Sequence, residues 1–342
     1  MAYTTIDKPT DYFNTKLYTG NGSTQSISGV GFQPDWVWIK DRGNATNHML
    51  FDSVRGTGKE LHSQNTDSET TQSNTLTAFG SDGFSLGSNA DVNNSSQNFA
   101  SWNWLAGGTA SSNTDGSITS SVSASATSGF SIVSYTGSGS NATVGHGLSS
   151  APSMIIFKAR GTGNWLVYHQ GIGNTHGLFL STNSAKDDDA TYFQDTDPTS
   201  SVFSIGTSTL VNDTNPYIAY CFAEKKGYSK FGSYTGNGNA DGTFIYTGFK
   251  PAWILVKVTS TIDEWNLVDV KRDTTNTGTE HPLFPNSSSA ESSGATRFNI
   301  LSNGFKCTTT NVSCNSSGAS YIFMAFAESP FVTSTGIPTT AR

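Results

Sequence analysis

Tyr18-Thr19-Gly20, Tyr135-Thr136-Gly137 and Tyr234-Thr235-Gly236 are three copies of one tripeptide, and the interpretation of the 342-residue sequence starts from them. The copies begin 117 and 99 residues apart (135 − 18 and 234 − 135). Each copy is followed by a proline and then by an apolar run that ends at a lysine; the pairs are Pro34 and Lys40, Pro152 and Lys158, and Pro251 and Lys257. An order of features that recurs at a nearly constant period predicts tandem structural repeats.

Each copy also ends in a similar way, with a second apolar stretch and then an aromatic-rich segment. These closing segments are 99–105, 217–224 and 321–328. The units therefore cover 11–106, 129–224 and 228–328, each close to the size of a small β-sandwich. The run between proline and lysine is apolar at consecutive positions, which predicts a central strand covered on both faces.

The remaining segments are predicted from their composition. Residues 1–10 form an N-terminal arm, and residues 329–342, rich in Pro, Thr and Ser, form a C-terminal tail. Residues 107–128 are rich in Ser, Thr, Gly and Ala, with only Ile118 and Val122 as apolar anchors, so we expect an extended linker there. Only residues 225–227 separate the last two units. We therefore expect that pair to be nearly rigid, and the first unit to be free to move.

Composition predicts an all-β fold, and the recurring order of features predicts three tandem, jelly-roll-like β-sandwich repeats. Charged residues make up 13% of the chain, so the Glu, Lys and Arg that cover helices are scarce, whereas Thr, Ser, Gly and aromatic residues are abundant. The net charge of −7 argues against binding to nucleic acid, which requires clustered Lys and Arg. We find neither an apolar run long enough to span a membrane nor a signal peptide, and expect synthesis in the cytoplasm.

The usual nucleotide and hydrolase motifs do not fit this sequence. The glycine cluster at 171–177 has the wrong spacing for a dinucleotide fingerprint, and 56–60 lacks the residues of a phosphate-binding loop. Six histidines are present, but no Gly-x-Ser-x-Gly elbow accompanies them. His169 is the most suggestive, yet Asp52 and Asp269 replace it in the sister units, which favours a polar residue at a strand end over a catalytic base.

Acidic residues and cysteines are likewise interpreted as structural. Glu224 and Glu328 end equivalent strands, and we expect both to face solvent rather than to form a glycosidase pair. The run Asp187-Asp188-Asp189 could offer oxygen ligands to calcium, but a solvated loop is favoured because the glycine and glutamate of an EF-hand are missing. Cys221 reads as a core residue, and pairing of Cys307 with Cys314 is not expected in a cytoplasmic chain. No metal and no cofactor are predicted.

Tryptophans are the best candidates for ligand contact. Seven are present, and most lie inside predicted strands, where core packing is the default. Trp165 lies beside a Gly- and Asn-rich loop and Trp265 beside Asp263 and Glu264, so we expect these two to be partly exposed. Their faces would then suit the apolar face of a pyranose ring.

Four segments resemble tandem-domain structural proteins of marine tailed bacteriophages: Ala2-Tyr3-Thr4-Thr5-Ile6-Asp7-Lys8-Pro9, Asn113-Thr114-Asp115-Gly116-Ser117-Ile118, Gly129-Phe130-Ser131-Ile132-Val133-Ser134-Tyr135-Thr136-Gly137 and Ala325-Phe326-Ala327-Glu328-Ser329-Pro330-Phe331. The likeness covers nearly the whole chain. It implies a place on the virion and transfers no catalytic residue.

Two functions from different classes follow. In the first, the protein is a non-enzymatic virion component, such as a tail fibre, an appendage or a capsid decoration, that contacts other virion proteins and attaches to host-surface glycans. By analogy with such proteins, we expect it to form a homo-oligomer, with a trimer as the expected state. In the second, it is a carbohydrate-binding module or a glycan depolymerase. Neither function involves nucleic acid or insertion into a membrane.

Overall fold

The protein is built almost entirely from antiparallel strands. The computed structural model describes residues 3–273, 276, 280–292, 294 and 297–339. Within these ranges the helical elements are η1 (Pro9–Asp11), α1 (Ala90–Asn93) and α2 (Ala190–Phe193), none of them longer than four residues. The predicted all-β class is therefore confirmed. No helix in the described ranges is long and apolar enough to cross a membrane.

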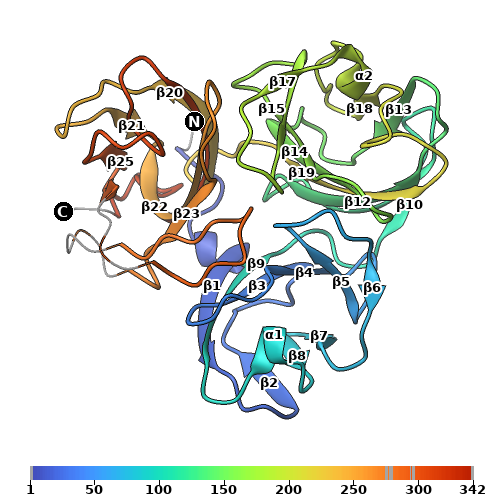
Figure 1. Ribbon diagram of the computed structural model, residues 1–342, viewed down its shortest axis with the longest axis horizontal. Helices are drawn as coiled ribbons and strands as arrows, with labels where there is room; N and C mark the ends of the chain where they lie inside the picture. The colour runs from blue at the N-terminus through green and yellow to red at the C-terminus, as the bar shows by residue number, and fades with distance from the viewer. Residues whose placement is uncertain (1–2, 274–275, 277–279, 293, 295–296, 340–342) are drawn as a thin grey trace.

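Figure 1 shows three lobes around a common centre, and each lobe contains a large sheet and a small one. The large sheet of the first unit has the order β1 (Phe13–Thr19), β9 (Asn98–Trp104), β3 (Trp36–Asp41), β4 (Met49–Asp52), β5 (Lys59–His62) and β6 (Thr70–Thr71). Its small sheet has the order β2 (Gln25–Ser28), β8 (Gly83–Leu86) and β7 (Leu76–Gly80).

The large sheet of the second unit has eight strands, more than that of either other unit. Its order is β10 (Ser111–Asn113), β11 (Ser120–Ser125), β12 (Phe130–Thr136), β19 (Pro216–Phe222), β14 (Met154–Ala159), β15 (Leu166–His169), β16 (His176–Phe179) and β17 (Asp187–Asp188). The accompanying small sheet pairs β13 (Ala142–Gly145) with β18 (Val202–Ile205).

The third unit has a shorter large sheet, with the order β20 (Ser229–Thr235), β26 (Ser320–Pro330), β22 (Phe249–Val258) and β23 (Asn266–Asp269). Its small sheet has the order β21 (Phe244–Tyr246), β25 (Gly304–Cys307) and β24 (Phe298–Leu301). The sequence β1-β9-β3-β4 thus recurs as β12-β19-β14-β15 and as β20-β26-β22-β23. This common order is what the prediction of three repeats requires.

The strand between proline and lysine is central in each large sheet and buried on both faces, as its pattern predicts. In β3 all six residues are buried. Val37 and Ile39 pack toward the small sheet of their own unit, against Ile27. Trp36 and Trp38 point the other way, into a core shared by all three units.

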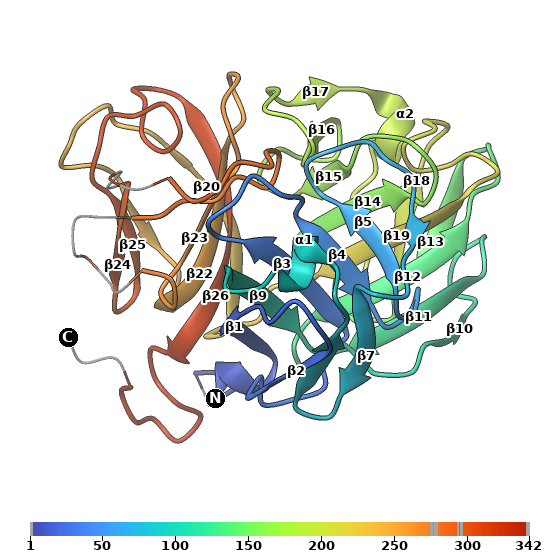
Figure 2. The ribbon, with the colours of Figure 1, turned by 60° about the horizontal axis from the view of Figure 1, so that its bottom comes forward.

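This shared core holds the lobes together through aromatic contacts. The ring of Trp36 in the first unit stacks on that of Tyr220 in the second, with centroids 4.4 Å apart. Phe13 of the first unit stacks on Phe326 of the third at 4.9 Å. Figure 2 shows β22 and β26 of the third unit beside β3 and β9 of the first. The first unit contacts both others, so the expectation that it is free to move is wrong.

The segment 107–128 is not the extended linker that its composition suggests. It contains β10 and β11, and β11 pairs with β12 along the edge of the second unit's sheet. Val122 is buried against the second unit, and Ile118 packs on the same cluster. Serine alternates with Val122 and Ala124 in residues 121–125, which is a strand pattern that the small size of the side chains obscures.

The Tyr-Thr-Gly motif clamps the turn before the closing strand. The hydroxyls of Tyr18, Tyr135 and Tyr234 each donate to a backbone carbonyl 2.7 Å away, at Val92, Val211 and Cys314. The next residue in each case is a fully buried asparagine, at Asn93, Asn212 and Asn315. Its side chain hydrogen-bonds backbone groups of the turn after the motif.

The lysine that ends the apolar run of each unit supports a loop. Lys40, Lys158 and Lys257 are buried, and each ammonium donates to two backbone carbonyls. Burial lowers the pKa of all three lysines to about 8. Each lysine therefore satisfies one carbonyl at the end of the central strand and one in a loop, which for Lys257 is the carbonyl of Asn183 in the second unit.

The glycine of the motif is required by a close backbone contact. A Cβ at Gly137 would lie 2.0 Å from the carbonyl oxygen of Asp213. Gly137→Ala should therefore lower the free energy of unfolding by about 1–3 kcal/mol, through forced displacement of the turn. Gly161→Ala is the matched control, because nothing lies within 4 Å of its Cβ position. Urea titration of both variants measures the difference. Equal stability of the two variants would contradict the requirement for glycine at position 137.

Candidate functional site

The two tryptophans expected to bind ligand are buried between units. Trp165 is 0% exposed and Trp265 is 1% exposed, so the expectation of partial exposure is wrong. The Trp165 indole N–H donates to the carbonyl of His62 in the first unit at 2.8 Å. The Trp265 indole N–H donates to the backbone carbonyl of Phe179 in the second unit at 2.9 Å. Their polar flanking residues suggested exposure, whereas a sister unit covers both rings.

Asp52 and Asp269, the residues equivalent to His169, are also interface residues. Asp52 accepts a hydrogen bond from the Tyr220 hydroxyl of the second unit at 2.8 Å. Asp269 accepts one from the indole N–H of Trp102 in the first unit at 3.0 Å. Each carboxylate also pairs with an arginine three residues later, and both side chains of each pair are fully buried.

His169 makes the third of these contacts in a different way. Its Nε2 lies 3.2 Å from the carbonyl oxygen of Phe323 in the third unit, and its Nδ1 accepts from the backbone N–H of Gly171. The residue that occupies the place of Trp102 and Tyr220 is Met324, which has no hydrogen-bond donor to offer. Burial lowers the pKa of His169 to about 4, so the ring is neutral at pH 7.

Two glutamates join units at the periphery of the ring. Glu69 of the first unit accepts two hydrogen bonds from Arg160 of the second, at 2.9 and 2.6 Å. Glu291 of the third unit accepts one from Arg42 of the first at 2.8 Å. Although burial opposes it, hydrogen bonding from Arg160 lowers the pKa of Glu69 below its usual value. These pairs leave no free carboxylate at either position.

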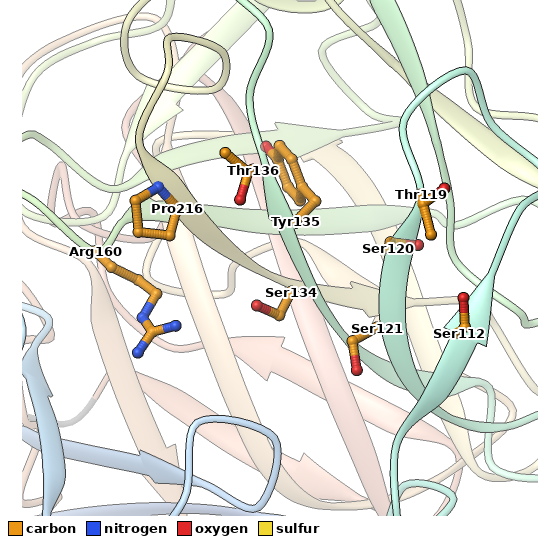
Figure 3. A pocket seen from close by; sticks show the side chains of 9 residues that line it. All are labelled: Ser112, Thr119, Ser120, Ser121, Ser134, Tyr135, Thr136, Arg160 and Pro216. Carbon is orange, nitrogen blue, oxygen red and sulfur yellow. The ribbon is translucent and has the colours of Figure 1, made fainter.

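A shallow hollow in the surface lies on the large sheet of the second unit (Figure 3), with a volume of about 390 Å³. Its floor is a row of three serines, Ser112, Ser121 and Ser134, that face one another across β10, β11 and β12. Arg160 and Pro216 border one side of the hollow. The remaining lining residues are Thr119, Ser120, Tyr135 and Thr136.

This serine pocket can bind polar ligands but has no acid–base pair. Adjacent strands lie about 4.8 Å apart, so the row presents hydroxyls at that spacing, each able to donate and accept. Arg160 adds a cationic edge, part of which Glu69 already uses. The chemistry fits non-covalent contact with a polyhydroxylated molecule. Sequence reasoning missed the site because two of its three floor strands come from the segment predicted as a linker.

The other candidates from the sequence have structural partners. Glu224 pairs with Lys230 at 2.8 Å and Glu328 pairs with Lys250, and of the two glutamates only Glu328 is exposed.

The acidic run and the cysteines also have structural roles. Asp189 caps α2 by accepting a hydrogen bond from the backbone N–H of Thr191 at 2.8 Å. Within the described ranges no group of three His, Cys, Asp or Glu residues could hold a metal ion. Cys221, Cys307 and Cys314 are buried free thiols.

Comparison with known proteins identifies a family without a function. The model of a domain of unknown function, DUF7483, matches residues 8–330. No curated protein and no solved structure matches the chain.

The tryptophans at the interfaces should stabilise the ring of units. We expect Trp165→Ala or Trp265→Ala to lower the free energy of unfolding by about 3–5 kcal/mol, because each leaves a cavity and an unpaired carbonyl. Urea titration measures the loss, with Ile262→Ala as a control at a side chain that is 67% exposed. Unchanged stability of both tryptophan variants would contradict their role between units.

His169 should make the fold sensitive to acid. Its pKa is about 4 in the folded chain and about 6.5 when unfolded, so the unfolded chain binds more protons as the pH falls between these values. The resulting loss of stability from this residue is at most about 3 kcal/mol. His169→Gln should lose less stability than the parent between about pH 7 and pH 4.5 in urea titrations. Parallel pH profiles would contradict this assignment.

Proposed function

Because the chain belongs to the DUF7483 family, whose function is unknown, we propose its function from its own structure and sequence: a structural component of a tailed-phage virion. In this role, as a tail fibre, an appendage or a capsid decoration, it displays β-sandwich units on the particle and serves attachment to the host surface. The observation that carries the proposal is the closed ring of three units around one aromatic core.

A closed ring suits a protein that must hold surfaces in fixed positions outside a cell. Each unit contacts both neighbours, and the contacts include Arg–Glu ion pairs, indole hydrogen bonds and stacked rings. Opening one unit would therefore expose apolar surface of the other two. The resemblance of 129–137 and 325–331 to marine phage structural proteins supports the same role.

A non-enzymatic role is part of the proposal. A hydrolase needs a base, an orienting partner and an acceptor site brought together in a cleft. Asp52, Asp269 and His169 are instead buried between units, and each is used in hydrogen bonds that hold the ring. The serine pocket presents hydroxyls and one guanidinium to solvent.

Carbohydrate binding is the second candidate function, and the serine pocket favours it. A row of hydroxyls beside an arginine can exchange hydrogen bonds with sugar hydroxyls without titration of any group. A carbohydrate-binding module would use this chemistry alone. A depolymerase would require a further catalytic pair.

Assembly with copies of itself, as a trimer, and with other virion proteins belongs to the same proposal. The apolar faces of the three large sheets are already covered within one chain. Copies would therefore meet through the outer small sheets and loops, and such contacts are more polar than the shared core.

The virion role predicts that the protein remains on purified particles. We expect mass spectrometry of gradient-purified virions of the encoding phage to detect the chain at a fixed copy number. Gold-labelled antibody against it should mark one location on intact particles. Recovery of the protein only in the soluble part of the lysate would contradict the proposal. A polysaccharide-cleavage assay with the same purified chain would contradict the non-enzymatic part if it showed turnover.

A further inference from the structure

The small sheet of the third unit carries exposed aromatic residues where its sister units carry small ones. Phe244 and Tyr246 are 44% and 56% exposed on β21, on either side of buried Ile245. In Figure 1 this small sheet lies on the outer side of its lobe, beyond β22 and β23. Side chains of this size and exposure gain nothing from packing in the core.

The register identifies the equivalent residues in the first unit. Ile245 faces Phe305 as Ile27 faces Phe84, so Phe244 and Tyr246 stand where that unit has Ser26 and Ser28. In the second unit, by the same alignment, the positions hold Thr143 and Gly145. The fold therefore accepts small side chains at both positions, and the aromatic rings of the third unit are not needed for it.

Neighbouring glycines let these rings lie against the sheet. A Cβ at Gly304 would lie 3.2 Å from the Phe244 ring, and one at Gly248 would lie 3.6 Å from the Tyr246 ring. Tyr3 continues the row, because its hydroxyl donates to the Gly248 carbonyl at 2.5 Å. We call Phe244, Tyr246 and Tyr3 the aromatic strip.

A positive charge lies at one end of the strip. The Lys226 ammonium is 4.5 Å from the centre of the Tyr3 ring, and Lys226 is exposed. Among the ion pairs of the described residues, none involves Lys226. At the other end Lys306 pairs with Asp241. The strip thus combines two exposed aromatic rings with one cation that has no carboxylate partner among the described residues.

We propose that the aromatic strip binds an acidic oligosaccharide, with pyranose rings on Phe244 and Tyr246 and a carboxylate or sulfate at Lys226. The C–H groups on one face of a pyranose carry partial positive charge and pack on the negative face of an aromatic ring. The exposed parts of Phe244 and Tyr246 are only a small fraction of the roughly 800 Å² that each partner of a stable protein interface buries. Charge complementarity at Lys226 selects an acidic sugar over a neutral one. The inference rests on the attachment function proposed above and names its ligand.

Binding of defined hexasaccharides to the full chain tests this inference. The probes are alginate, hyaluronan and chondroitin sulfate hexamers, with cellohexaose as the neutral comparison, measured by calorimetry. We expect at least one acidic hexamer to bind, and Phe244→Ser with Tyr246→Ser to raise its Kd at least tenfold. These substitutions restore the residues of the first unit, so the fold is retained. Lys226→Gln should raise Kd severalfold and weaken the salt dependence.

Two control variants separate the strip from other surfaces. Ile262→Ser alters an exposed apolar side chain elsewhere in the third unit and should leave Kd unchanged. Ser121→Tyr fills the serine pocket and should also leave it unchanged. Loss of binding in Ser121→Tyr alone would overturn the strip but support carbohydrate binding in the pocket.

Other results would overturn the inference directly. Absence of binding to every acidic hexamer would do so, and so would equal affinity for cellohexaose. A dimer in light scattering that dissociates with Phe244→Ser and Tyr246→Ser would identify the strip as a contact between copies. None of these results would contradict the proposed virion role, because mass spectrometry and antibody labelling of purified particles test that role separately.

Discussion

The structure depends on central strands that are apolar on both faces and must therefore be covered twice. In β14, Ile155 and Phe157 face the second unit's own small sheet, whereas Met154 and Ile156 face away from it. A unit with one small sheet cannot cover the second face by itself. The sister units supply that cover, and the cost of leaving it in water, about 25 cal/mol for each Å² of apolar surface, opposes their separation.

The polar contacts at the interfaces follow from the side chain that the neighbouring unit presents. Tyr220 and Trp102 offer a hydroxyl and an indole N–H, and a carboxylate accepts each of them. The equivalent Met324 offers neither, so a carboxylate there would remain buried without that bond. A neutral histidine occupies the position instead and uses backbone partners. The replacement of Asp by His169 and of Tyr or Trp by Met324 is thus one coordinated change.

The sequence alone indicates features that depend on local order and misses those that depend on contacts between units. The all-β class and the doubly covered strands follow from composition and from apolar runs near each proline. The burial of Trp165 could not be predicted, because the carbonyl that it binds belongs to His62, more than 100 residues away in the chain. Likewise, Ser121 lies in a strand whose small residues resemble a linker. The serine pocket that it lines could therefore not be predicted from the sequence.

The three units resemble one another in the core and differ at the surface, and this contrast indicates where binding can evolve. Substitutions in the core affect two units at once, because every central strand is packed on both sides. The residues on the outer face of a small sheet lie outside the shared core, so they can change without disturbing the packing between units. Among the described residues the β10–β11 hairpin occurs only in the second unit's sheet, and the third unit alone has aromatic residues at the positions of Phe244 and Tyr246. Features that a sister unit lacks are not required by the fold that the three units share.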